Sequence, residues 1–91
     1  MKKILKFFSP TCGPCKIMSK NIEEALKSLN DVELQDIDIT EPSNEVLIEK
    51  YKPTTVPTLI ILDKEDNIIE KLRGIHSVDK IIEVCQGQLN I

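Results

Sequence analysis

The 91-residue sequence is poor in aromatic side chains and in cysteine. It has no tryptophan, and aromatic residues make up only 3% of the chain. The core must therefore be aliphatic, and the abundance of Ile, Leu and Val favours a buried sheet. The three cysteines form one close pair and one distant single. This pattern lacks the even count and wide spacing of a secreted domain stapled by disulfides.

Long apolar runs and an excess of basic charge are also missing. No run approaches the roughly 20 apolar residues of a spanning helix, and Lys6 interrupts an N-terminal stretch already too short for a signal peptide. We therefore expect a cytoplasmic protein with no membrane partner. The 12 basic and 15 acidic residues give a net charge of −3. Without a basic stripe, we expect no nucleic-acid partner either.

The length predicts a single domain over residues 1–91, which we expect to be monomeric. Apolar patterning and turn residues predict the order β-α-β-α-β-β-α. Helical crossovers make the early strands parallel, and the final hairpin adds an antiparallel pair. We therefore expect an α/β fold, a four-stranded mixed sheet with helices on both faces. The expected strands are 3–8, 32–39, 58–62 and 68–72, and the expected helices are 14–30, 42–51 and 77–85.

Each expected helix presents an apolar face. The first has Ile17, Ile22, Ala25, Leu26 and Leu29 at helical spacing, and the second has Val46, Leu47 and Tyr51 directed inward. The third carries Val78, Ile81, Ile82 and Cys85 on one side, which predicts that Cys85 is a buried hydrophobic residue. His76 is expected to be solvated in the loop before this helix.

Cys12-Gly13-Pro14-Cys15 lies where the first strand meets the first helix. Residues three apart on a helix have Cβ atoms about 5–6 Å apart, which suits a disulfide that opens and closes with little backbone motion. The helix N-terminus should stabilise a Cys12 thiolate and lower its pKa, and Lys16 should add to this effect. Cys15, one turn further along, should be more buried. The predicted chemistry is thiol–disulfide exchange, in which Cys12 attacks a disulfide and Cys15 then displaces the product.

A zinc site is the alternative interpretation of the close cysteine pair. Zinc takes four ligands, and only Cys85 and His76 remain to complete the set. Neither belongs to a second paired motif, so we expect no metal and no cofactor.

Three segments resemble the thioredoxin family. They are FFSPTCGPCK at residues 7–16, Val56-Pro57-Thr58, and Arg73-Gly74 followed by residues 77–82. The resemblance implies a thioredoxin-like fold in which Pro57 is cis and lies against the cysteine pair. It also implies that the Val56 backbone binds an extended client segment, with Thr11, Gly13, Pro14 and Gly74 supporting the site.

The sequence departs from the family pattern at several positions. Thr11 replaces the usual tryptophan, and the family's extra N-terminal strand and helix are missing. Lys6 stands where thioredoxins carry a buried carboxylate. One hypothesis is that Lys6 lowers the pKa of Cys15 and pairs with Glu33 or Asp36 on the adjacent strand. The alternative is that Lys6 extends into solvent and has no role.

The resemblance implies a dithiol electron carrier that reduces disulfides in client proteins. Its expected partners are those clients and a thioredoxin reductase of the NADPH–flavin or ferredoxin type. Two alternatives remain open: a glutaredoxin-type enzyme that uses glutathione, and a non-catalytic binding module.

Overall fold

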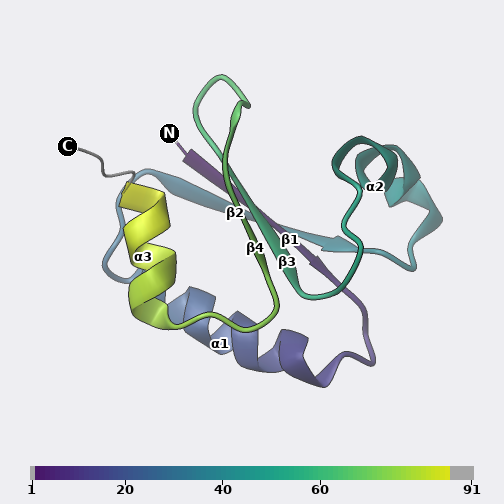
Figure 1. Ribbon diagram of the computed structural model, residues 1–91, viewed down its shortest axis with the longest axis horizontal. Helices are drawn as coiled ribbons and strands as arrows, with labels where there is room; N and C mark the ends of the chain where they lie inside the picture. Colours follow the sequence, from purple (N-terminus) through teal and green to yellow (C-terminus); the bar gives the residue numbers. More distant parts are fainter. Residues whose placement is uncertain (1, 87–91) are drawn as a thin grey trace.

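The computed structural model describes residues 2–86, which form a four-stranded sheet with helices on both faces. The predicted fold class and element order are confirmed (Figure 1). The elements in chain order are β1 (Lys2–Phe8), α1 (Gly13–Leu26), β2 (Val32–Asp38), a 3₁₀ turn η1 (Pro42–Asn44), α2 (Glu45–Tyr51), β3 (Thr58–Leu62), β4 (Ile68–Arg73) and α3 (Val78–Gln86).

The strand order across the sheet is β2-β1-β3-β4. β1 pairs in parallel with β2, as the helical crossover between them requires. β3 runs antiparallel to both β1 and β4. Every residue of β3 is buried, which explains why its apolar run shows no alternation. The two central strands thus supply most of the buried sheet surface.

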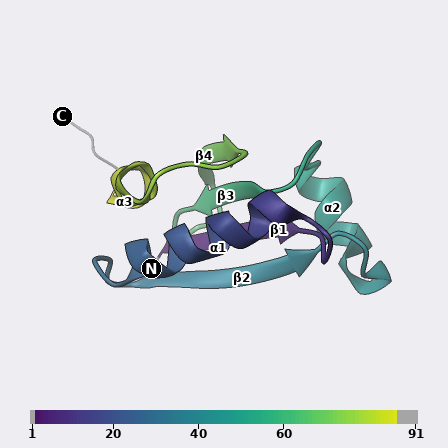
Figure 2. The ribbon, with the colours of Figure 1, turned by 90° about the horizontal axis from the view of Figure 1, so that it is seen from below.

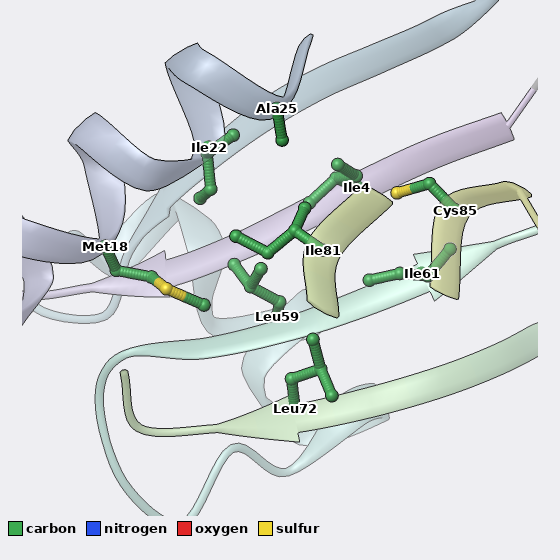
Figure 3. Packing of buried hydrophobic residues seen from close by; sticks show 9 residues of the cluster. All are labelled: Ile4, Met18, Ile22, Ala25, Leu59, Ile61, Leu72, Ile81 and Cys85. Carbon is green, nitrogen blue, oxygen red and sulfur yellow. The ribbon is translucent and has the colours of Figure 1, made fainter. Parts of the chain in front are cut away.

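Alternating side chains of the central strands build two cores. Ile4 of β1 and Ile61 of β3 pack with α1 and α3, and this cluster includes Met18 and Ile22 (Figure 3). The neighbouring residues Leu5 and Phe7 face the other way and pack with Tyr51 of α2. In Figure 2, α2 lies at one end of the sheet, far from α3. Both faces therefore have a helical cover, as predicted.

The first helix is shorter than predicted, and one residue of its predicted apolar face is exposed. It ends at Leu26, not near residue 30, because residues 27–29 continue as tight turns with bonds to the carbonyl three residues back. Asp31 then takes a positive φ of 60°, which redirects the chain into β2. Ile17 is 51% exposed, so its predicted place in the core is wrong, and the neighbouring Met18 is buried instead.

Two further apolar residues from the predicted patterns, Val46 and Ile39, are exposed. Val46 is 77% exposed, so its predicted inward position in the second helix is wrong. α2 has only seven residues, and its inner face is already filled by Leu47, Ile48 and Tyr51. Ile39 lies just beyond the end of β2 and is exposed. Among residues 2–86, no helix combines the length and apolar character needed to cross a membrane.

Candidate active site

The cysteine pair lies at the start of α1, as predicted. Cys12 is the N-cap of the helix, and its backbone N–H donates to the carbonyl of Ser9. Gly13 and Pro14 are the first two helical residues. Pro14 suits this position because the first turn of a helix has no use for its missing N–H. Both cysteines therefore belong to the first turn of α1, and the start of this helix determines their positions.

Cys12 and Cys15 are joined by a disulfide, with their Cα atoms 5.2 Å apart. The Cys12 sulfur accepts a hydrogen bond from the backbone N–H of Cys15, with N···S 3.0 Å. Cys15 is 3% exposed, whereas Cys12 is only half-buried. The prediction that Cys15 is the more buried sulfur is confirmed. An attacking molecule therefore meets Cys12 first.

Lys6 extends from β1 beneath the start of α1 and is buried, so the alternative in which it reaches solvent is wrong. Lys6 is 7% exposed, and its ammonium donates to the hydroxyl of Ser19. It lies 3.7 Å from an Asp36 carboxylate oxygen, which confirms one of the two predicted partners. The other candidate, Glu33, is in register with Lys3.

A small pocket joins this lysine to the redox pair. Its volume is about 190 Å³, and its lining residues are Lys6, Phe8, Ser9, Pro10, Cys12, Cys15, Lys16 and Ser19. Lys16 is exposed at the rim. Ser19 lines the same pocket and is not among the site residues predicted from the sequence. Its signal was its position four residues after Cys15, which places both side chains on one face of α1.

The loop before β3 confirms the prediction for Pro57. The Val56–Pro57 peptide bond is cis, and Pro57 is fully buried. Thr58 donates from its hydroxyl to the Thr55 carbonyl, which closes the turn that contains this bond. The backbone N–H of Gly74 donates to the Pro57 carbonyl, with N···O 2.9 Å. Contact of Pro57 with the cysteine pair stays a prediction.

A second set of hydrogen bonds ties the loop after Gly74 to α1. Asn21 donates from its side chain to the His76 carbonyl, and the His76 backbone N–H points to the Met18 sulfur. The His76 ring lies 2.9 Å from the Arg73 carbonyl oxygen. His76 is half-buried: its backbone is held against α1, while its ring contact with Arg73 lies in an exposed position, so the residue is only partly solvated. Neither Met18 nor Asn21 carried a signal in the sequence for this role.

The third cysteine lies in the core near the other end of the sheet. Cys85 packs against residues such as Ile4 and Ile81, and lines a pocket with Lys2 and Asp31 at the start of β1 and β2. Burial raises the pKa of its thiol to about 11, while Lys2 acts in the opposite direction. Within residues 2–86, no three His, Cys, Asp or Glu side chains gather where they could share a metal ion.

Comparison with known proteins identifies this arrangement. The thioredoxin family model matches residues 1–86. The chain belongs to the thioredoxin family. It is 30% identical to thioredoxin of Bacillus subtilis over 84 residues, which is 91% of this chain and 78% of the relative. Thioredoxin O2 of Arabidopsis thaliana in its oxidised state superposes with a TM-score of 0.80 at 27% identity, covering 94% of this chain and 73% of that one.

The thioredoxin-family relatives also include much longer proteins. The chain is 28% identical to protein disulfide-isomerase of Zea mays over 94% of its own length, but spans only 18% of that relative. The family match and the intact Cys12–Cys15 pair support thiol–disulfide oxidoreductase chemistry.

Proposed function

We propose that this protein reduces disulfide bonds in client proteins, with Cys12 as the attacking sulfur and Cys15 as the resolving sulfur. The Cys12 thiolate attacks a client disulfide, which forms a mixed disulfide and releases one client thiolate. Cys15 then attacks Cys12, so that the intramolecular bond forms and the second client sulfur leaves. The client gains two electrons, and the protein ends in its disulfide form.

The observation that carries this proposal is the asymmetry between the two sulfurs. Cys12 caps α1 and accepts the Cys15 N–H, so the helix N-terminus favours negative charge on it. Cys15 is buried and close enough to bond to Cys12, so it can react only with a mixed disulfide that has already formed on Cys12. This division of exposure matches the two successive steps.

We propose that clients dock across the cis-proline loop. The Val56 backbone pairs with an extended client segment in the manner of strand addition. The hydrogen bond between Gly74 and Pro57 supports this role because it keeps the two loops together. Thr11, Gly13 and Pro14 flank the half-buried Cys12 in the sequence and complete the contact surface, since all three are solvent-exposed.

The partner that restores the dithiol is, in this proposal, a thioredoxin reductase of the NADPH–flavin or ferredoxin type, and the compartment is the cytoplasm. Turnover with a model protein disulfide, coupled in turn to each reductase and to glutathione, tests this assignment. Activity with glutathione alone would favour the glutaredoxin-type alternative. A pair that does not cycle in a dithiol buffer would favour the binding-module alternative.

Trapping tests the division of roles between the cysteines. Cys15→Ser should hold clients as mixed disulfides through Cys12, because the resolving sulfur is gone. Cys12→Ser is the matched control and should trap far less, because both remaining cysteines, Cys15 and Cys85, are buried. Equal trapping by both variants, on gels run without and with reductant, would contradict the proposal.

A further inference from the structure

The fold buries one charged side chain next to the redox pair. Among residues 2–86, Lys6 is the only charged residue that is buried; it is 7% exposed. Burying an ammonium is costly unless other groups compensate its charge. A position this close to the active site therefore calls for a functional explanation.

The groups around Lys6 compensate its charge only in part. The Ser19 hydroxyl accepts one hydrogen bond but carries no charge. The Asp36 carboxylate is 3.7 Å away and its side chain is 54% exposed, so water weakens this ion pair. The Phe8 ring, centred 5.0 Å from the ammonium, adds a weak cation–π contact. The positive charge of Lys6 is therefore only partly compensated, and a closer anion would stabilise it further.

The redox pair supplies such an anion only when it is open. Lys6, Ser19 and both sulfurs line one pocket of about 190 Å³. In the disulfide form the sulfurs are neutral. Reduction places two thiols at the pocket, and Cys15 is the buried one, on the same face of α1 as Ser19. The other charged groups at this site are Lys16, exposed at the rim, and Asp36 behind Lys6.

We propose that Lys6 is a positioning residue that keeps the open Cys15 as a thiolate, with Ser19 holding its ammonium toward the pocket. This inference rests on the proposed function and assigns how its second step proceeds. Lys6 acts through its positive charge and transfers no proton in this step. The Cys15 thiolate attacks the Cys12 sulfur, the Cys12–client bond breaks, and the electron pair leaves on the client sulfur, which takes a proton from water. No side chain has to act as a base.

A consequence for redox balance follows from the same charges. Lys6 gains the Cys15 thiolate as an additional, anionic partner only in the open state, so it favours the dithiol over the disulfide. Removing its positive charge should make the protein more strongly reducing. Removing the competing carboxylate of Asp36 should act in the opposite direction, because Lys6 then interacts with the thiolate alone.

The test is the equilibrium of the full chain with reduced and oxidised glutathione at pH 7. For Lys6→Met we expect the equilibrium to shift about tenfold toward the disulfide form, which is about 30 mV for two electrons. Asp36→Asn should shift it severalfold toward the dithiol, and Lys6→Arg should stay close to wild type. Glu33→Gln is the control. It removes a carboxylate from β2, the strand of Asp36, but Glu33 is in register with Lys3 and does not line the pocket, so the equilibrium should not change.

A second readout follows the Cys15 thiolate itself. In a Cys12→Ser background, its ultraviolet titration should move to higher pH with Lys6→Met and to lower pH with Asp36→Asn. If wild type cycles with glutathione but all variants share one potential and one titration curve, the role of Lys6 is wrong and the proposed function stands. If wild type does not cycle at all, both are wrong. Asp36→Asn keeps the test decisive should Lys6→Met fail to fold, because Asp36 is largely exposed.

Discussion

The backbone N–H of Gly74 donates to the carbonyl oxygen of Pro57 across a distance of 2.9 Å. This bond joins the end of β4 to the residue that precedes β3 and so closes the sheet beside the cis peptide. Gly74 has a positive φ of 81°, a conformation that side-chain-bearing residues rarely adopt. The bond therefore depends on a residue that tolerates this backbone geometry.

Replacing Gly74 by alanine should destabilise the protein by about 1–2 kcal/mol. The cause is backbone strain alone, because an added Cβ would meet no atom within 4 Å. Urea unfolding of the oxidised protein measures the change. Gly13→Ala is the matched control, since it also has open space but no positive φ. It should be neutral or slightly stabilising, and equal losses in both variants would contradict this account.

Of the three thiols of the reduced protein, Cys12 should be modified fastest and Cys85 slowest. At neutral pH Cys12 should react with iodoacetamide faster than free cysteine, because the helix N-terminus stabilises its thiolate. Cys85 should stay unmodified in the native state, since burial holds its pKa near 11. Peptide mapping after a timed alkylation distinguishes the sites. A Cys12 that reacts no faster than free cysteine would contradict the proposed attacking role.

Cys85 should also make stability depend on pH in the alkaline range. Its native pKa of about 11 exceeds the ordinary thiol value of 9.0. The native state thus holds this proton more tightly than the unfolded state does, which stabilises the fold fully below pH 9 and less as pH rises toward 11. The total loss should be about 2–3 kcal/mol.

Comparison with Cys85→Ala isolates this contribution, because the Cys12–Cys15 disulfide does not titrate in the oxidised protein. The variant should be less stable at neutral pH, since it leaves a void in the core beside Ile4. Its stability should fall less steeply across the alkaline range. Parallel stability profiles of the two proteins would show that the buried thiol contributes nothing to the slope.

Truncation of two β-branched residues in helices should change stability by very different amounts. Ile22 is fully buried between α1 and the sheet, so Ile22→Ala should cost about 2–5 kcal/mol. Val46 is 77% exposed, so Val46→Ala should lie within about 0.5 kcal/mol of wild type. Thermal and urea unfolding check both values. A large loss for Val46→Ala would mean that α2 buries this side chain in solution.

The hairpin turn offers a test at acid pH. Asp63 accepts hydrogen bonds from the backbone N–H of Asn67 and of Glu65, and these bonds lower the pKa of its carboxyl below the ordinary 3.8. The stabilisation is present above that value and is lost as pH falls through the native pKa. Wild type should therefore lose stability more steeply in acid than Asp63→Ala. Identical slopes would argue against these bonds in solution.

The strands and the redox motif could be predicted because their signals are local. β3 is a continuous apolar run, and Pro14 between the two cysteines is a residue typical of the first turn of a helix. The cis bond at Pro57 was predicted only through family resemblance, since its residues alone allow either isomer.

The errors have two physical causes. Ile17 and Met18 point about 100° apart around α1, and Met18, not Ile17, has the i, i+4, i+7 spacing with Ile22 and Ala25 that faces the core. Ser19 and Asn21 are ordinary helix-surface residues in sequence, and only the partners that folding brings to them, Lys6 and the His76 carbonyl, give them a role. Long-range contacts of this kind leave no periodic pattern along the chain.

The turn between β3 and β4 lies at the other end of those strands from Pro57 and Gly74. Residues 63–67 can therefore change in length or accept an inserted reporter peptide while the disulfide end of the molecule stays as it is. A tag placed there would report on the domain in living cells without blocking the face where clients are proposed to arrive.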